Sequence, residues 1–194
     1  VQNAGSALVK LANVLGGPIM ATYRRQDTFP NNHKNYAGHL DINRLPYQKR
    51  AIAEADLLIV VGSRLDGITS EDGKIPHKNQ KLLHIYPGEE VLARCRADLA
   101  LLSDPAPACC AIAKMINSKQ TPNSEKISYW RKELHENYLN ICKPSSVTIY
   151  GAVDLSQIAN KVQNQAPPET IIITDGGSFA RWIHRFYQFK EPIE

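Results

Sequence analysis

The sequence has no long hydrophobic run and no block of like charge, and each absence excludes a class of protein. No apolar stretch approaches the ~20 residues that a membrane-spanning helix needs. The 23 basic and 19 acidic residues are interspersed and leave a net charge of +4, so no charge cluster favours nucleic acid or an anionic membrane as a partner. No GxGxxG follows a predicted strand, which argues against a nicotinamide dehydrogenase. The composition is that of an ordinary soluble globular protein.

Cysteine is sparse and has no functional spacing. Cys95, Cys109, Cys110 and Cys142 form no CxxC or zinc-type pattern, and the vicinal pair falls on an apolar helical stripe. We therefore expect packing cysteines in a reducing compartment and a cytoplasmic location. The start of the sequence, 1–5, has neither an initiating Met nor a signal-peptide pattern, which suggests a fragment or a processed chain.

The rest of the sequence is organised around the segment from Ala55 to Gly67. An uninterrupted apolar run, Leu57 to Val61, ends abruptly at Gly62, which is typical of a strand buried on both faces of a parallel sheet. Gly62 would allow a ligand to approach the backbone closely. Arg64 can bind an anion, and Asp66 can accept a hydrogen bond from a hydroxyl group of the ligand. The edge has the outline of a nucleotide site, although polar glycine loops also end strands that bind nothing.

The elements around this strand predict a three-layer, Rossmann-like parallel α/β unit over residues 1–117. The expected helices cover 5–15, 46–54, 87–94 and 105–116, and the expected strands cover 19–22, 57–61, 81–86 and 99–102. Residues 23–44 are expected to form a long functional loop whose histidines, His33 and His39, lie on the surface or make hydrogen bonds rather than bind a metal. In a doubly wound fold a strand precedes the first helix, so the sheet should lack its first strand.

Residues 118–146 are predicted to be a linker that contains an amphipathic helix. Its apolar positions recur at steps of three and four, which predicts one buried face: Ile127, Trp130, Leu134, Tyr138 and Ile141.

Residues 147–194 are predicted to be the truncated start of a second α/β unit. We expect a helix around 155–162, a buried strand at 171–173, and a turn, Gly176-Gly177-Ser178, that leads into a helix over 179–187. Free backbone N–H groups at such a turn can hold a phosphate. Because a single strand cannot form a sheet, apolar surface around 171–173 and Trp182 should remain exposed.

In this order, the motifs resemble the thiamine-diphosphate-dependent decarboxylase and carboligase family, which includes acetolactate synthase, benzoylformate decarboxylase and oxalyl-CoA decarboxylase. Four segments carry the resemblance: Asp27-Thr28-Phe29-Pro30 through His39, Ala55 through Asp66, His84-Ile85 with Asp98 and Asp104, and Thr174-Asp175-Gly176-Gly177-Ser178 with Trp182. The resemblance identifies 1–117 as the central domain and 147–194 as the start of the diphosphate-binding domain.

The resemblance implies two sites. Gly176, Gly177 and Ser178 would touch the diphosphate of thiamine diphosphate. In the acetolactate synthase branch the central domain holds FAD, and the matching positions are Gly5, Gly38, Gly62, Arg64, Asp66 and Ile85. Tyr86-Pro87 stands where those enzymes carry an acidic pair, so an ADP-type nucleotide or an empty domain remains an alternative to FAD.

The implied function is that of a fragment of an enzyme acting on a 2-oxo acid with thiamine diphosphate and Mg²⁺. The Gly-Asp-Gly motif that binds magnesium and the pyrimidine domain are not in this sequence, so we expect the chain to be inactive alone. Its partners would be the missing domains of the same subunit and further copies in a homo-oligomer. The alternative is a stand-alone nucleotide-binding or subunit-assembly module without catalysis.

Overall fold

The chain folds into two parallel sheets with helices on both sides. The structure is a computed structural model that describes residues 4–117, 125–167 and 169–191. The strands are β1 (Ile19–Ala21), β2 (Tyr36–His39), β3 (Leu57–Val61), β4 (Lys81–Tyr86) and β5 (Leu99–Leu102). One sheet pairs β1 with β2, and the other has the order β3-β4-β5. The predicted parallel α/β architecture is confirmed.

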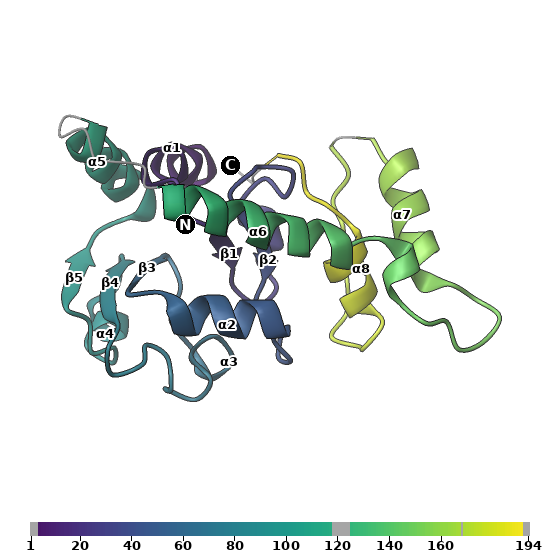
Figure 1. Ribbon diagram of the computed structural model, residues 1–194, viewed down its shortest axis with the longest axis horizontal. Helices are drawn as coiled ribbons and strands as arrows, with labels where there is room; N and C mark the ends of the chain where they lie inside the picture. Colours follow the sequence, from purple (N-terminus) through teal and green to yellow (C-terminus); the bar gives the residue numbers. More distant parts are fainter. Residues whose placement is uncertain (1–3, 118–124, 168, 192–194) are drawn as a thin grey trace.

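The two sheets are separated between β1 and β3 (Figure 1). In the common order of doubly wound sheets, 3-2-1-4-5-6, the first strand lies between the second and the fourth. If β1 and β2 are counted as the second and third strands, and β3 to β5 as the fourth to sixth, the separation falls at the position of a first strand. The two small sheets thus follow the order of one Rossmann-like sheet.

Helices flank the sheets and continue into the C-terminal unit. α1 (Gly5–Leu15) packs against α5 (Pro105–Asn117) on one side, while α2 (Pro46–Glu54), α3 (Gly67–Ser70) and α4 (Glu89–Leu92) lie on the other (Figure 1). The long helix α6 (Glu125–Ile141) contacts β2. Beyond it, the short 3-10 turn η2 (Pro144–Ser146) leads to α7 (Leu155–Gln165) and α8 (Ala180–Phe186), which pack on each other.

Local sequence signals account for the helix ends. α1 ends at Gly16, whose left-handed φ of 72° lets its N–H donate to the Ala12 carbonyl. Pro46 occupies the first turn of α2, where a missing N–H is harmless. The Asp154 carboxylate accepts hydrogen bonds from the first backbone N–H groups of α7. The predicted bounds of α1 and α2 are confirmed.

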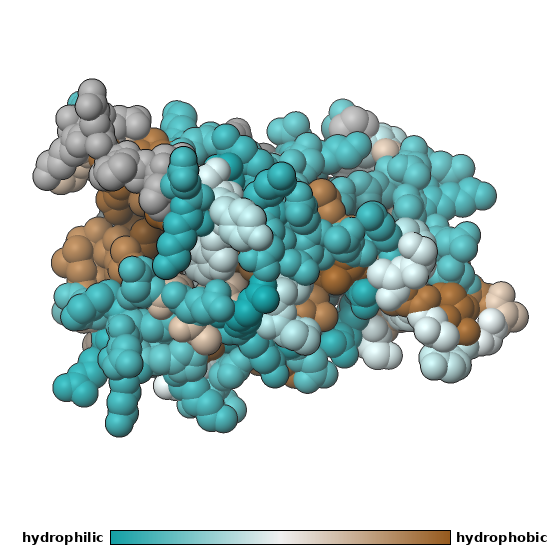
Figure 2. All heavy atoms as spheres, viewed as in Figure 1, coloured by the Kyte–Doolittle hydropathy of each residue, from teal (hydrophilic) through white to brown (hydrophobic). Residues whose placement is uncertain are grey.

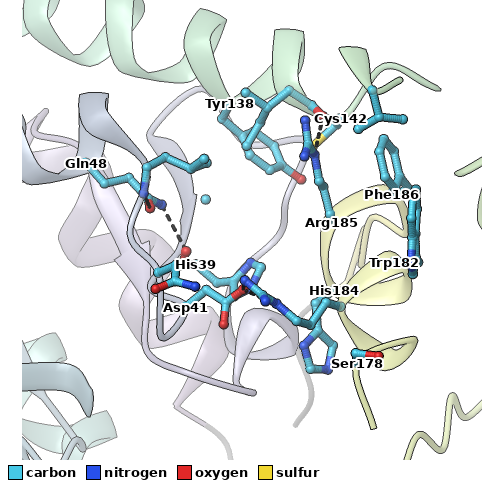
Figure 3. Close-up of a pocket in the computed structure, with 16 residues that line it drawn as sticks. His39, Asp41, Gln48, Tyr138, Cys142, Ser178, Trp182, His184, Arg185 and Phe186 are labelled. Atoms are coloured by element: carbon cyan, nitrogen blue, oxygen red, sulfur yellow. Dashed lines mark hydrogen bonds and ion pairs between the residues drawn. The ribbon is translucent and has the colours of Figure 1, made fainter. Parts of the chain in front are cut away.

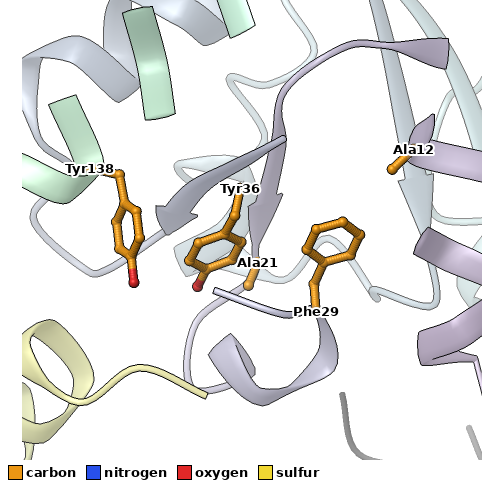
Figure 4. Packing of buried hydrophobic residues seen from close by; sticks show 5 residues of the cluster. All are labelled: Ala12, Ala21, Phe29, Tyr36 and Tyr138. Atoms are coloured by element: carbon orange, nitrogen blue, oxygen red, sulfur yellow. The ribbon is translucent and has the colours of Figure 1, made fainter. Parts of the chain in front are cut away.

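An aromatic cluster joins the first sheet to α6. Tyr36 on β2 lies between Phe29 and Tyr138 of α6 (Figure 4), with ring centroids 6.2 Å and 4.8 Å away respectively. Ala12 and Ala21 complete this cluster of buried residues. Leu134, one turn before Tyr138, is also fully buried, so the predicted inward face of α6 is confirmed at these two positions.

Two expectations about the first unit are wrong. The segment 23–44 is not one irregular loop, because β2 and the 3-10 turn η1 (Gln26–Thr28) lie within it. Tyr36, Ala37 and Gly38 have no β-branched pattern, and their strand conformation follows from pairing with β1.

β3 is not buried on both faces, since Leu57 is 48% exposed and the rest of the strand is half-buried. A strand at the edge of a three-stranded sheet lacks a neighbour to cover it.

The second unit also departs from the prediction. Residues 171–173 are not a buried strand: they pair with no other strand of the described residues, and Ile171 and Ile173 are 83% and 89% exposed. The expected exposed apolar surface is therefore present there, whereas Trp182 is half-buried and stacks on Phe186. α7 buries Ala159 but leaves Ile158 and Val162 partly exposed.

A second apolar surface lies at the other end of the molecule. In Figure 2 the brown side chains gather at the left, at the end of the molecule that holds β5 and α5, and Leu99 and Leu102 are among the exposed apolar residues there. Within the described ranges, no helix is long and apolar enough to cross a membrane.

Candidate functional site

The turn before α8 presents backbone donors that lack acceptors. Gly176 N–H donates to Asp175 Oδ1 (2.6 Å), and the Gly177 carbonyl accepts from Ala180 N–H (N to O, 3.1 Å). The N–H groups of Gly177 and Ser178 have no acceptor in the described parts of the chain. Two adjacent free donors in an exposed turn can bind an anionic group.

The guanidinium of Arg24 lies beside this turn. A Cβ atom placed on Gly176 would be 3.3 Å from Arg24 Nη2, so this cation sits against the face of the turn that glycine leaves open. Arg24 belongs to the loop after β1 and has a left-handed backbone φ of 60°. Within the described ranges, no carboxylate lies at ion-pair distance from it.

A cavity of about 370 Å³ separates the end of β2 from α8 (Figure 3). Gly38, His39 and Gln48 contribute from β2 and α2, and Tyr138 and Cys142 from the end of α6. Ser178 of the glycine turn and one face of α8 close the other side. The cavity therefore joins the central unit to the start of the second one.

The cavity holds two uncharged imidazoles. The rings of His39 and His184 meet edge to face with centroids 5.8 Å apart, and neither His39 Nε2 nor His184 Nδ1 has a partner among the described residues. Burial lowers the pKa of His39 to about 4, with a further lowering from His184 and Arg181 and an opposing effect of Asp41. Burial also lowers the pKa of His184. Both rings are therefore neutral at pH 7.

Two arginines of α8 hold the second unit on the first. Arg181 pairs with Asp41 (Nη2 to Oδ2, 2.9 Å). Arg185 donates to the Ile141 carbonyl (2.8 Å) and to the Ser146 hydroxyl (3.0 Å), and burial lowers the pKa of its guanidinium. These bonds fix α8, and with it the glycine turn, relative to the ends of β2 and α6.

A pair of hydrogen bonds between Asn31 and Phe189 also holds the second unit on the first. Asn31 N–H donates to the Phe189 carbonyl (2.7 Å), and Phe189 N–H donates to Asn31 Oδ1 (2.9 Å). The Asn31 amide also donates to the carbonyls of Gln26 and Phe29, 2.8 Å away in each case. One buried asparagine thus ties the loop after β1 to the segment after α8.

Part of the predicted nucleotide edge is assembled at the ends of β3 and β4. Gly62, with φ 66°, donates its N–H to the Ile85 carbonyl (2.9 Å). Arg64 is exposed, and Asp66 caps α3 by accepting from Thr69 N–H (2.8 Å). The side chain of Ile85 is fully buried, so only its backbone can face a ligand.

The remaining two predicted positions lie elsewhere. Gly5 is buried at the start of α1. Gly38 has φ 92°, and a Cβ there would be 2.9 Å from the Tyr47 hydroxyl oxygen and 3.1 Å from Gln48 Nε2. Packing alone therefore requires glycine at 38, and this residue lines the cavity together with Ser178.

Comparison with known proteins identifies the family. Residues 1–112 match the family model described as the thiamine pyrophosphate enzyme, central domain. The chain belongs to the thiamine pyrophosphate enzymes. The resemblance found in the motifs is thereby confirmed at the level of the family.

The relatives of this thiamine pyrophosphate enzyme chain match it along nearly all of its length. A probable acetolactate synthase large subunit of Methanocaldococcus jannaschii is 24% identical over 99% of this chain and 33% of its own length. An acetolactate synthase of Mycobacterium bovis is 23% identical over 97% of this chain and 31% of its own length. The chain spans about a third of the length of these relatives.

Solved structures show the same fold. A thiamine diphosphate-dependent 4-hydroxybenzoylformate decarboxylase of Rhodococcus jostii superposes with a TM-score of 0.67 at 16% identity, covering 96% of this chain and 33% of that one. A thiamin diphosphate-dependent enzyme of Mycobacterium smegmatis gives a TM-score of 0.65 at 17% identity, covering 96% of this chain and 34% of its own.

The glycine turn of this thiamine pyrophosphate enzyme chain fits a diphosphate in charge and in space. Gly177 and Ser178 offer free N–H donors, and the open face of Gly176 is lined by a cation. Within the described residues there is no cluster of three or more His, Cys, Asp or Glu side chains that could hold a metal ion. The free donors and the cation of the turn suit an anionic group such as a diphosphate.

Sequence reasoning missed several residues of this thiamine pyrophosphate enzyme chain that surround the turn. Arg24, Arg181, His184 and Arg185 come from a loop and a helix where basic residues are common, so composition did not single them out. His39 was expected on the surface or in a hydrogen bond, but its side chain is half-buried and its buried Nε2 has no partner among the described residues. His33, by contrast, accepts from Asn35 N–H (3.2 Å), as predicted.

Proposed function

We propose that this chain is part of a larger thiamine-diphosphate-dependent enzyme that acts on a 2-oxo acid by decarboxylation or carboligation, in an acetolactate synthase-like reaction. The observation that carries the proposal is the glycine turn, with two free backbone donors and an adjacent guanidinium, in a chain of this family. The relatives that support acetolactate synthase-like chemistry match along 97% or more of the chain.

Under this proposal the chain contains one whole unit and the beginning of another. Residues 1–117 are the central, nucleotide-binding-like domain, 118–146 the linker, and 147–194 the start of the diphosphate-binding domain. The Arg181–Asp41 ion pair and the bonds between Asn31 and Phe189 support this division, because they are local contacts between the two units. The glycine turn is then held at a fixed place beside the end of β2.

The residues of the turn would bind and orient the cofactor. Gly177 and Ser178 N–H would donate to the diphosphate, and Gly176 would allow its close approach. Thiamine diphosphate, when bound, supplies the chemistry that makes the bond next to a carbonyl breakable, while the protein places it. Mg²⁺ would be held with the help of residues outside this sequence.

The central domain would bind FAD or another ADP-bearing nucleotide along the edge formed by Gly62, Arg64 and Asp66, with Gly5, Gly38 and the Ile85 backbone as further positions. Arg64 is exposed and can reach a phosphate, and Asp66 has one carboxylate oxygen, Oδ2, outside its cap hydrogen bond. Tyr86-Pro87 offers no carboxylate for a ribose, which keeps an ADP-type ligand or an empty domain as alternatives.

We further propose that the complete enzyme is a cytoplasmic homo-oligomer. The four cysteines carry free thiols, which suits a reducing compartment. The exposed Ile171 and Ile173 would be covered by the rest of the second domain.

The test compares the full-length protein of the natural source with this 194-residue segment. Each is supplied with thiamine diphosphate, Mg²⁺ and a 2-oxo acid such as pyruvate or benzoylformate, and release of carbon dioxide is measured. We expect turnover by the full-length protein that is lost when the cofactor is omitted, and no turnover by the segment.

Two results would contradict the proposal. Turnover by the segment alone would show that it is not an inactive fragment. A natural protein near 21.6 kDa that binds a nucleotide but not thiamine diphosphate would instead identify the stand-alone binding or assembly module.

A further inference from the structure

We propose that Arg24, a residue of the central domain outside the glycine turn, binds the diphosphate of the cofactor at Gly176–Ser178. This inference rests on the proposed function. It adds a contact from the first unit to a site that the motifs place wholly in the second.

The position of Arg24 is the first argument. It lies three residues after the end of β1, yet its Nη2 would be 3.3 Å from a Cβ at Gly176, more than 150 residues further along the chain. Only glycine accommodates this approach without a shift, since 3.3 Å is tighter than ordinary van der Waals contact. The guanidinium and the free N–H groups of Gly177 and Ser178 therefore belong to one local surface.

The missing counter-charge is the second argument. Arg25, the next residue, pairs with Asp27 (Nε to Oδ1, 3.2 Å), and Arg181 pairs with Asp41. For Arg24 the described residues provide no carboxylate at ion-pair distance. Its guanidinium carbon lies over the Tyr23 ring, 5.1 Å from the ring centroid. Arg24 thus brings a positive charge to this surface without a carboxylate paired to it among the described residues, while the Asp175 carboxylate of the turn accepts from Gly176 N–H.

The surroundings of the turn agree with this distribution of charge. The charge of Arg24 contributes to the lowered pKa of His184, after burial and against the opposing effect of Asp41. The backbone of Arg24 has the left-handed φ that non-glycine residues seldom adopt, and this conformation is the one in which its side chain reaches the turn.

The chemistry of the ligand follows from the donors. A guanidinium presents parallel N–H groups that match two oxygens of a phosphate, and backbone N–H groups add bonds to the same anion. A diphosphate carries enough oxygens for both sets of donors, whereas an uncharged alcohol would leave the guanidinium without a counter-charge. Arg24 would therefore discriminate between phosphorylated and unphosphorylated forms of the cofactor.

The experiment measures cofactor affinity in the full-length protein by isothermal titration calorimetry in the presence of Mg²⁺. The probes are thiamine diphosphate and thiamine, and the variants are R24Q, R24K and the neighbouring R25Q as the matched control. Loss of a charge-assisted contact to phosphate should weaken thiamine diphosphate binding about tenfold or more in R24Q. R24K should recover part of the loss, and R25Q should bind as the parent does.

A second variant reaches the same contact from the other side. G176A keeps Arg24 but places a methyl group 3.3 Å from its Nη2, so the guanidinium must shift away from the turn, and thiamine diphosphate binding should weaken while thiamine binding stays unchanged. Thermal unfolding of each variant checks that the fold is intact.

The outcomes separate this inference from the function beneath it. If the parent protein binds thiamine diphosphate and R24Q binds it equally well, the inference is wrong and the proposed function stands. If R24Q weakens thiamine and thiamine diphosphate to the same extent, Arg24 has a structural role and the inference is again wrong. A parent protein that binds no thiamine diphosphate overturns both.

Discussion

A half-buried histidine of the cavity, His39, makes the stability of this protein sensitive to acid. The His39 ring faces His184, Asp41 and Arg181, and burial lowers its pKa from 6.5 to about 4. In the unfolded chain the same imidazole takes up a proton near pH 6.5, whereas the folded state takes it up only near pH 4. The unfolded state therefore binds more protons in between, and folding is weakened as the pH falls through this window.

The size of the effect follows from the two pKa values. Each unit of difference between the two pKa values corresponds to about 1.4 kcal/mol. The free energy of unfolding therefore falls by about 3 kcal/mol between pH 7 and pH 4 through this one group. About 2 kcal/mol of that loss is already present at pH 5. This is a large share of a stability that in natural domains is about 5–15 kcal/mol.

The assay is urea unfolding of the parent and of H39F at pH 7, 6 and 5. Phenylalanine keeps a flat ring against His184 and cannot titrate, and His39 Nε2 has no hydrogen bond to lose among the described residues. We expect the free energy of unfolding of the parent to fall by about 2 kcal/mol more than that of H39F between pH 7 and 5.

The matched control is H77Q, since His77 is exposed and lies outside the cavity. This variant should follow the parent at each pH. Parallel curves for the parent and H39F would refute the reasoning, because they would mean that the His39 proton is bound equally in the folded and unfolded states.

Two further predictions concern glycine and asparagine positions. G38A should destabilise the fold by about 1–3 kcal/mol, because φ is 92° and a Cβ would be 2.9 Å from a tyrosine hydroxyl, whereas G17A, with nothing within 4 Å of its Cβ, should change the urea midpoint little. N31A should leave the Phe189 N–H without its acceptor, so amide hydrogen exchange in 180–191 should become faster while exchange in α1 stays the same. Equal protection of 180–191 in the parent and in N31A would show that the Asn31 side chain does not hold this segment.

Sequence patterns were most informative where one local signal determined the structure. The glycine after α1 and the proline at the start of α2 fixed helix ends that the structure reproduces. The apolar runs 57–61, 81–86 and 99–102 identified β3, β4 and β5. β2 was missed because Tyr36 and Ala37 become a strand through pairing with β1, a long-range contact that has no periodic signal within four residues.

The strand expected at 171–173 failed for the opposite reason. Its three isoleucines carry a strong local strand signal, but the described residues hold no partner strand for them, and an unpaired segment forms no ladder. Side-chain identity therefore predicted the propensity correctly and the pairing incorrectly. The same argument explains why Ile171 and Ile173 remain exposed while Ala159 on α7, which needs no ladder to pack, is buried.

The candidate site likewise has a part that local sequence predicts and a part that depends on long-range contacts. The glycine turn is recognisable locally, since two adjacent glycines between an apolar run and a helix are a standard turn signal, whether or not a ligand binds there. The side chains around it arrive from separate elements: Arg24 from the loop after β1, His39 from β2 and Arg181 from α8. The local sequence of each segment does not show that these side chains meet, because their meeting depends on the docking of α8 by Asn31 and Asp41. A variant that loosens this docking should therefore alter cofactor affinity without changing a residue of the turn. We expect both N31A and R24Q to weaken thiamine diphosphate binding. N31A should also reduce the hydrogen-exchange protection of α8, whereas R24Q should leave that protection unchanged.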